Sequence, residues 1–331
     1  MKIAFLEVEN WEKKYLKKIF PTAQFFDSVL TVQKIKKMQD VEIISPFIYS
    51  ELTAEKLALL PNLKLIATRS TGFDHIDVAF CKQKNIAIAY VPVYGENTVA
   101  EHTFALLLAL SRKLIPSVER AKSGDFNLAG LRGFDLAGKT IGIIGTGNIG
   151  AHVARIASGF GMKVLGFDLN RNEDLVKKYN LRYTNTLVEL VSNSDIITLH
   201  LPLNEHTHHI IDKGILNQTK RGAYLINTAR GGLVDDEALL WALESNILAG
   251  VGLDVLEEEP LIREERELLH HRFNSAEMKD YICENILLRH PKVIVTPHNA
   301  FNSKEALKRI LDTTAANIQN FIKGQAQNLV K

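Results

Sequence analysis

The chain has 331 residues, of which 46% are hydrophobic and 24% charged, a balance typical of a globular protein large enough for two apolar cores. Its 40 basic and 38 acidic side chains leave a formal net charge of +2, which excludes the strong positive field of a nucleic-acid-binding protein. Two distant cysteines, a start without a signal-peptide pattern and the lack of a membrane-spanning apolar run predict a reducing, cytoplasmic location without membrane contact.

In the first part of the chain, short runs rich in Val, Ile and Leu alternate with segments of helical period. Strands are predicted at 2–8, 41–47, 63–69 and 86–91, and helices at 11–20, 54–60 and 76–84. Uniformly apolar strands separated by helices are typical of a parallel sheet that is covered on both faces. This part therefore predicts one α/β unit.

The segment 98–122 has apolar residues at helical spacing, and we predict one connecting helix that is kinked at Pro116. Six strands of a doubly wound Rossmann sheet are then predicted at 140–144, 163–167, 195–201, 223–227, 249–253 and 293–296. A charged, helix-prone insertion at 261–290 precedes the last of them.

The final helix, predicted at 303–323, can return to the first unit. We therefore expect two Rossmann-like α/β domains with doubly wound parallel sheets, the smaller of which is discontinuous. Residues 1–98 plus 302–331 form this smaller domain, and residues 99–301 form the other.

The motif GTGNIG at 145–150 lies between a predicted strand and a predicted helix. Gly145 permits a tight turn, Gly147 lets the backbone approach a pyrophosphate, and Gly150 allows the helix to pack closely on the strand. The helix N-terminus adds free amides and a positive dipole end. This context indicates a dinucleotide site.

Asp168 follows strand 163–167, where a carboxylate accepts hydrogen bonds from an adenosine ribose and repels a ribose phosphate. NAD rather than NADP is therefore expected, although Arg171 would offset the repulsion if it turned inward. Leu201 and Pro202 end another strand, at the carboxyl edge where ligands of such sheets bind.

Arg230 follows strand 223–227, so its guanidinium emerges at the same edge, where it can hold a carboxylate through paired donors. The two glycines after it leave room for a close ligand. The alternative is a surface arginine that pairs with Asp235 or Asp236.

His298 lies just past strand 293–296, and imidazole is the side chain whose proton affinity suits acid and base chemistry at neutral pH. Glu259 can accept the far ring N–H of His298 and stabilise its protonated form. Taken alone, residues 257–259 also fit a solvated acidic loop.

Other histidines are weaker candidates. His206, His208 and His209 suggest a metal, but their loop setting and the lack of a nearby cysteine or carboxylate cluster predict no metal site. Glu101 and His102 are adjacent in a predicted helix and point to different faces, which favours a helix start over an acid/base pair.

The segments GTGNIG, NTARGG, DVLEEEP and TPHNA, in this order, resemble the D-isomer-specific 2-hydroxyacid dehydrogenase family, and within it the D-lactate dehydrogenases. The resemblance extends over nearly the whole chain. Residues 69–77 resemble the substrate loop of the family, and residues 92–94 and 100–102 resemble the segment that enters its hinge. The resemblance implies the roles given above for Arg230, Glu259 and His298, and it places Asp254 near the nicotinamide.

The resemblance implies which residues bind the two ligands. Cofactor contacts are expected at Gly145, Gly147, Asn148, Ile149, Gly150, Asp168, Leu201, Pro202, Thr207, Thr228, Ala229, Arg230, Asp254, His298 and Ala300. Substrate contacts are expected at Phe47, Ser70, Thr71, Gly72, Tyr94, Arg230, His298 and Phe301. Residues 1–98 plus 302–331 would then be the substrate domain and residues 99–301 the NAD-binding domain.

The resemblance implies a substrate pocket lined by the aromatic residues Phe47, Tyr94 and Phe301, which favours a small substrate. The expected activity is therefore reduction of pyruvate to D-lactate by NADH, in a homodimer. A reductase of glyoxylate, hydroxypyruvate or another 2-oxo acid is the alternative enzyme. An NAD-sensing, corepressor-like binding protein is the alternative from another class.

Overall fold

The computed structural model describes residues 1–257 and 275–330. The chain divides into two units, Met1–Gly95 with Asn302–Lys331 and Glu96–Phe301, so the smaller unit is assembled from both ends of the sequence. The division falls at the start of helix α5 (Glu96–Ser111), whereas a boundary after residue 98 would cut into this helix.

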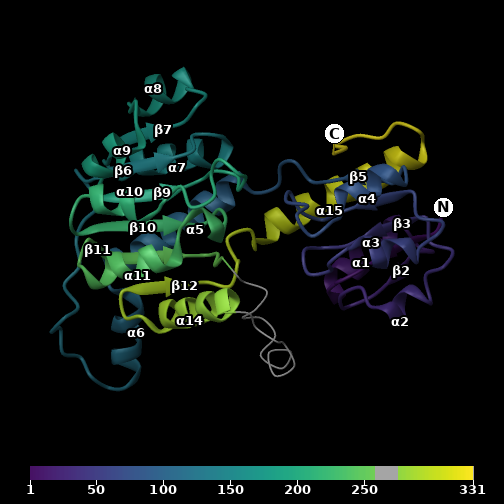
Figure 1. Cartoon of the computed structure of the whole chain (residues 1–331), viewed down its shortest axis with the longest axis horizontal. Coiled ribbons are helices and arrows are strands. Elements are labelled where there is room, and N and C mark those ends of the chain that lie inside the picture. Colours follow the sequence, from purple (N-terminus) through teal and green to yellow (C-terminus); the bar gives the residue numbers. More distant parts are fainter. Residues whose placement is uncertain (258–274, 331) are drawn as a thin grey trace. The chain divides into compact units, whose positions relative to one another are not determined.

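The first unit contains a parallel sheet in the order β2-β1-β3-β4-β5; Figure 1 labels β2, β3 and β5 of this sheet. Its strands in chain order are β1 (Ile3–Phe5), β2 (Gln24–Phe25), β3 (Ile43–Ser45), β4 (Leu65–Ala67) and β5 (Ala87–Ala89). Four of them lie inside the predicted runs. The prediction missed β2, because two residues are too short to show a periodic pattern.

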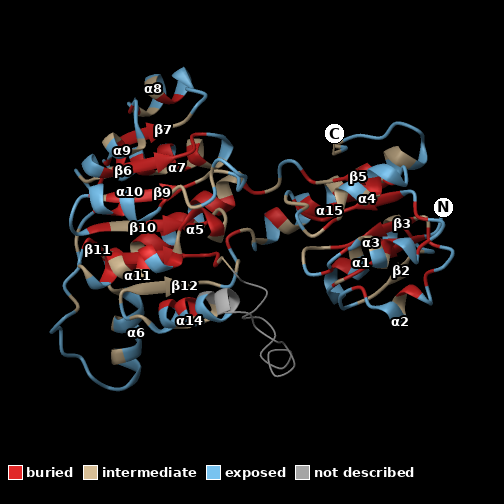
Figure 2. Ribbon diagram, viewed as in Figure 1, coloured by how far each residue is buried: buried red, intermediate tan, exposed pale blue. Residues whose placement is uncertain are grey.

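Helices cover both faces of this sheet. Apolar side chains of α1 (Asn10–Ile19) and α15 (Lys304–Ile322) pack into one core, and those of α2 (Val32–Ile35), α3 (Ala54–Ala58) and α4 (Val78–Gln83) into another. The strands lie between these cores, which explains the mainly apolar sequences of β1, β3, β4 and β5; Figure 2 shows these four as largely buried, whereas both residues of β2 are only partly buried. After α15, Leu329 pairs with Ala89 of β5, so the end of the chain joins this sheet.

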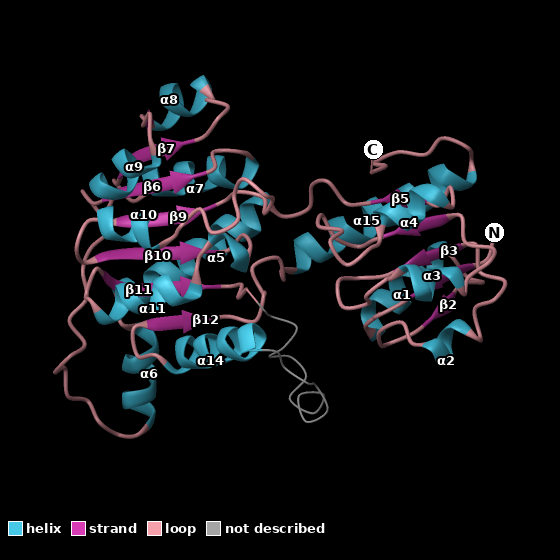
Figure 3. Cartoon of the chain, in the orientation of Figure 1, coloured by secondary structure: helices cyan, strands magenta, loops and turns pink. Residues whose placement is uncertain are grey.

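The second unit contains a parallel sheet in the order β12-β11-β10-β9-β6-β7-β8; Figure 3 shows the strands from β12 to β7 in this order. Its strands are β6 (Thr140–Ile144), β7 (Lys163–Phe167), β8 (Arg182–Tyr183), β9 (Ile196–Leu199), β10 (Ala223–Asn227), β11 (Leu248–Leu253) and β12 (Val293–Val295). The described residues thus give this sheet seven strands, and the prediction of six was wrong because it missed the two-residue β8. The strand order reverses between β6 and β9, the point at which doubly wound sheets bind ligands.

Helices also cover both faces of this second sheet. The helices on one face are α5, α7 (Asn148–Gly159) and α8 (Glu173–Tyr179), and those on the other are α9 (Leu187–Asn193), α10 (Lys213–Gln218), α11 (Asp236–Glu244) and α14 (Ser275–Arg289). Within residues 1–257 and 275–330, no helix combines the length and the apolar character needed to cross a bilayer.

The predicted connecting helix is in fact two helices, α5 and α6 (Leu114–Lys122). Pro116 does not kink a continuous helix but occupies the first turn of α6, where its missing N–H costs nothing. Its ring would clash with the carbonyl of Arg112 in a continuous helix, four residues earlier. The chain therefore breaks at Lys113, which has a left-handed φ of 50°.

Candidate functional site

The glycine loop joins β6 to α7, and each glycine meets a different constraint. Gly145 has a φ of +92°, and a Cβ there would lie 2.5 Å from the carbonyl oxygen of His200. A Cβ on Gly150 would lie 2.1 Å from the carbonyl oxygen of Gly145. At Gly147, which caps α7, a Cβ would meet no protein atom within 4 Å. The first and third glycines are thus required by packing, whereas the second leaves open space at a helix N-terminus, as a bound pyrophosphate requires.

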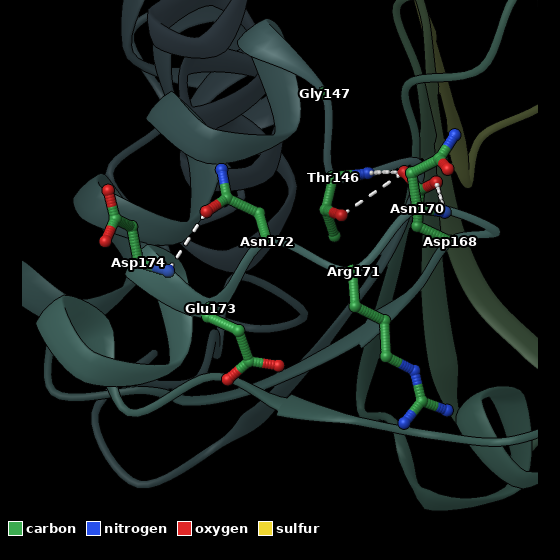
Figure 4. Close-up of a pocket in the computed structure, with 8 residues that line it drawn as sticks. All are labelled: Thr146, Gly147, Asp168, Asn170, Arg171, Asn172, Glu173 and Asp174. Carbon is green, nitrogen blue, oxygen red and sulfur yellow. Dashed lines mark hydrogen bonds between the residues drawn. The ribbon is translucent and has the colours of Figure 1, made fainter.

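Asp168 follows β7 and its carboxylate is fixed beside this loop. One oxygen accepts hydrogen bonds from the Thr146 amide at 2.6 Å and from the Thr146 hydroxyl at 3.2 Å, and the other accepts from the Asn170 amide at 2.8 Å. A cavity of about 620 Å³ opens here (Figure 4). Its lining residues are Thr146, Gly147, Asp168, Asn170, Arg171, Asn172, Glu173 and Asp174. Two residues predicted to contact the cofactor, Gly147 and Asp168, therefore share one cavity.

Arg171 lines the same cavity, but its guanidinium points away from the Asp168 carboxylate (Figure 4). It donates to the side-chain oxygen of Asn185 at 2.8 Å and lies over the ring of Tyr183, 5.6 Å from its centroid. These contacts hold the cation against β8 and the residues after it. Arg171 therefore does not offset the negative charge of Asp168 in this cavity, which fits NAD and disfavours a ribose phosphate.

The chemical candidates follow three neighbouring strands. Asn227 of β10 is in register with Leu253 of β11, and Leu253 is in register with Val295 of β12. Arg230, Asp254 and His298 each come within three residues of these ends. Because the strands are parallel, all of these residues emerge at the carboxyl edge of the sheet, as the glycine loop does.

Asp254 is fully buried, and its carboxylate is surrounded by donors. The donors are the hydroxyl of Thr296 at 2.5 Å, the amides of Asn299 and Ala300 at 2.8 Å each, and Nε2 of His102 at 3.3 Å. Burial raises the pKa of Asp254, but hydrogen bonds from His102, Thr296 and the two amides outweigh it, so the pKa lies below its usual value. Asp254 is therefore a charged anchor for the segment after β12.

His298 lies in the middle of that segment, with a left-handed φ of 50°. Its amide donates to the carbonyl oxygen of Asp254 at 2.9 Å, and the next two amides bind the Asp254 carboxylate. A non-glycine residue holds such a backbone conformation only where its surroundings fix it. Asp254 thus positions His298.

Arg230 lies in a loop that is stabilised by hydrogen bonds between its own residues. The Asn227 side chain accepts from the amide of Ala229 at 3.0 Å and donates to the carbonyl of Arg230 at 2.8 Å. A Cβ on Gly231 would lie 2.1 Å from the backbone of Leu256, so the glycine is required where this loop packs against the segment after β11. Asp235, considered above as an ion-pair partner, accepts from the Ala238 amide and caps α11.

Two residues of α5 support this edge through contacts that the sequence did not predict. His102 contacts Asp254 and lies 3.0 Å from the Thr296 hydroxyl, and the Thr103 hydroxyl lies 2.9 Å from that of Thr228. The sequence signal that was available for His102 was its place in the family-like segment 100–102. His102 lies 152 positions before Asp254, so no local sequence pattern indicates that the two residues are in contact.

Glu259 lies outside the described residues, so its pairing with His298 stays a prediction. The predicted substrate residues Phe47, Ser70, Thr71, Gly72 and Tyr94 belong to the first unit, whereas Arg230, His298 and Phe301 belong to the second.

The loop with Ser70 and Thr71 is internally hydrogen-bonded. The Ser70 hydroxyl donates to the Gly72 carbonyl at 2.6 Å, and the Thr71 hydroxyl donates to the Val91 carbonyl at 2.7 Å. Arg69, which directly precedes this loop, is buried. It donates to the backbone carbonyls of Ser45 and Leu6 and lies over the Phe47 ring, 5.9 Å from its centroid. Arg69 therefore ties the ends of β1, β3 and β4 to the predicted substrate loop.

His208 and His209 lie beside a carboxylate in the folded chain. Nε2 of His209 lies 2.7 Å from a carboxylate oxygen of Glu257, and Nε2 of His208 lies 3.5 Å from the same oxygen. The sequence indicated no cysteine or carboxylate cluster near these histidines, but the loops after β9 and β11 meet in space and bring the Glu257 carboxylate to them.

Residues 104–300 match the family described as D-isomer specific 2-hydroxyacid dehydrogenase, NAD binding domain. The chain is 36% identical to the 2-hydroxyacid dehydrogenase homolog 1 of Schizosaccharomyces pombe, over 97% of this chain and 96% of that protein. It is also 36% identical to the glycerate dehydrogenase of Methylorubrum extorquens, over 100% and 99%.

Among solved structures, the D-lactate dehydrogenase of Aquifex aeolicus complexed with NAD and lactic acid has a TM-score of 0.86 and 36% identity, with 98% of this chain and 96% of that chain covered. These findings confirm the predicted pair of Rossmann-like α/β sheets and the predicted cofactor, NAD.

Proposed function

Because the chain belongs to the D-isomer-specific 2-hydroxyacid dehydrogenase family, we propose that this oxidoreductase is an NAD-dependent D-lactate dehydrogenase, which reduces pyruvate to D-lactate. The observation that carries the proposal is the emergence of Arg230, Asp254 and His298 from neighbouring strand ends at the edge that also bears the glycine loop. A cation and an acid/base group at this edge suit a 2-oxo acid.

When bound, NADH would supply the hydride for the substrate carbonyl carbon. In the proposed reaction, Arg230 binds the substrate carboxylate through paired N–H donors, which orients the carbonyl group. His298 donates a proton to the carbonyl oxygen, and in the reverse direction it accepts the proton of the hydroxyl group. Glu259 stabilises the protonated imidazole, and Asp254 keeps the His298 segment in place through its hydrogen bonds.

The choice of pyruvate is supported by the aromatic residues Phe47, Tyr94 and Phe301, at positions that resemble the aromatic pocket residues of D-lactate dehydrogenases. Residues 1–98 with 302–331 are proposed as the substrate domain and residues 99–301 as the NAD-binding domain. Since relatives of equal identity carry the names D-lactate dehydrogenase and glycerate dehydrogenase, the substrate must be decided by measurement.

The substrate is tested by steady-state oxidation of NADH with pyruvate, hydroxypyruvate, glyoxylate and phenylpyruvate. We expect kcat/KM to be highest for pyruvate by at least about tenfold, the discrimination that one added or missing group in a closed pocket provides. A higher kcat/KM for hydroxypyruvate or glyoxylate would support the reduction of a 2-oxo acid but would identify that compound, and not pyruvate, as the substrate. No turnover with any of them would favour an NAD-sensing binding protein.

We also propose a homodimer. The helix α6 exposes Leu114, Ile115 and Val118, and the following Phe126 and Leu128 are 81% and 80% exposed. Apolar side chains gathered on one segment are typical of a surface that another chain covers. Light scattering should give the mass of two chains for the wild type and of one chain for a Phe126→Ser, Leu128→Ser variant. A monomeric wild type would overturn the proposal.

A further inference from the structure

Three side chains with no part in the proposed reaction converge in the second unit. His208 and His209 come from the loop after β9, and Glu257 from the segment after β11. One possible ligand atom from each side chain lies within 4.8 Å of the other two. The two imidazole rings are stacked, with centroids 3.9 Å apart and an angle of 28° between the planes. Both rings therefore present a nitrogen to the same carboxylate.

Successive side chains of a strand point to opposite faces, so adjacent histidines seldom share one target. Here His209 has a left-handed φ of 49°, which departs from the extended chain. The preceding residues are held by hydrogen bonds, because the amide of His208 donates to the Asn204 carbonyl at 2.9 Å and the Thr207 hydroxyl donates to the Pro202 carbonyl at 2.7 Å. The backbone of this loop thus brings the two rings together.

Both segments that form the cluster contact the loop that carries Arg230. The His209 amide donates to the carbonyl of Gly232 at 2.8 Å. On the other side, Gly231 packs against the backbone of Leu256, directly before Glu257. The cluster is therefore set by backbone contacts that do not depend on the side chains themselves.

We propose that His208, His209 and Glu257 bind one Zn²⁺ ion. Two imidazole nitrogens and one carboxylate oxygen form a three-ligand set that zinc accepts, with a water molecule as the fourth ligand. The nitrogen ligands disfavour Mg²⁺ and Ca²⁺, which take oxygen ligands. An ion about 2.1 Å from each ligand atom needs those atoms roughly 3 to 4 Å apart. The distances of 2.7 and 3.5 Å to Glu257 lie near that range, and on binding the two rings would turn out of their stacked arrangement so that both nitrogens face the ion.

The ion would link the loop after β9 to the segment after β11. The first contains Pro202 and Thr207, which are predicted to contact the cofactor, and the second continues to Glu259. Because protons compete with the metal for both imidazoles, the affinity for Zn²⁺ should fall as the pH is lowered. Zinc binding itself does not rest on the proposed function, since it can be measured without any substrate.

The test uses the full chain after removal of metals by a chelator. Calorimetric titration with Zn²⁺ alone should show one ion per chain, with affinity at least about tenfold lower in His208→Ala and in Glu257→Gln. The matched control is His206→Ala, an exposed histidine of the same loop, which should bind as the wild type does. Thermal unfolding in chelator confirms that each variant is folded. Because the His208 side chain is exposed, its replacement should disturb the fold least.

Titration with Co²⁺ gives an independent readout, because a four-coordinate ion with nitrogen ligands absorbs visible light far more strongly than an octahedral one. We expect this absorption in the wild type and in His206→Ala, and its loss in His208→Ala. Equal Zn²⁺ affinity in all four proteins, no Zn²⁺ binding by the wild type, or an octahedral Co²⁺ spectrum would each overturn the proposal and leave a hydrogen-bonded histidine–glutamate cluster.

Discussion

Replacing Asp254 with asparagine removes one charge from a buried position and keeps the shape of the side chain. In the wild type, one carboxylate oxygen accepts from Thr296 and the Asn299 amide, and the other accepts from the Ala300 amide. An asparagine offers only one acceptor oxygen, and its NH₂ group is a donor. One backbone amide of the His298 segment must therefore face the NH₂ group of the asparagine, so that two donors meet.

The expected magnitude follows from these contacts. A hydrogen bond to a charged group contributes about 1.5–3 kcal/mol, and a buried donor left without a partner costs about 1–3 kcal/mol. Asp254→Asn should thus lower the free energy of unfolding of the second unit by about 3 kcal/mol at pH 7. The matched control is Asp174→Asn, whose side chain is 68% exposed and whose effect should stay within about 0.5 kcal/mol.

The pH dependence provides a second signature. The pKa of Asp254 is lowered in the folded chain, so the stabilisation by its charge is complete above the unfolded pKa of about 3.9 and is lost as the pH falls through the folded value. The difference between wild type and variant should consequently stay constant between pH 7 and pH 5 and shrink below about pH 4.

Urea unfolding followed by tryptophan fluorescence measures this difference. The chain has two tryptophans, so a Trp11→Phe background leaves Trp241 of α11 as a reporter within the second unit. Similar losses for Asp254→Asn and Asp174→Asn, or a difference that grows as the pH falls, would refute the anchoring role.

Gly147→Ala should weaken NADH binding at least about tenfold without lowering the thermal midpoint, because the new Cβ meets no protein atom; unchanged NADH affinity in a fluorescence titration would contradict this. Asp168→Ala should reduce the preference for NADH over NADPH in kcat/KM, and a wild type that already prefers NADPH would refute the interpretation. His298→Gln should lower kcat about 10²–10⁴-fold with NADH affinity retained, whereas Arg230→Lys should mainly raise the KM for the 2-oxo acid. Wild-type kcat or wild-type KM, respectively, would remove each residue from its role.

Local patterns were enough to predict most of the second sheet. Strands such as Thr140–Ile144 and Ala223–Asn227 are buried on both faces, and their apolar runs end where the ladder ends. The glycine loop was also predictable, because the constraints at Gly145 and Gly150 arise from neighbouring backbone. Strand ends in turn indicated which polar residues share one edge.

Contacts between distant segments were beyond sequence patterns. The His102 interaction with Asp254 and the approach of Glu257 to His209 depend on how separate loops meet after folding. The break before α6 shows a different cause, since Pro116 acts on the carbonyl four residues earlier and not at its own position. The direction of Arg171 was likewise set by Tyr183 and Asn185, which lie on another strand and its loop.

Identifying the reaction product tests the proposed reaction most directly. Wild-type protein is mixed with NADH and pyruvate, NADH oxidation is followed by absorbance, and the lactate enantiomers are separated by chiral chromatography. We predict D-lactate in an amount equal to the NADH oxidised. Formation of L-lactate, or no oxidation of NADH with any 2-oxo acid, would contradict the proposed reaction.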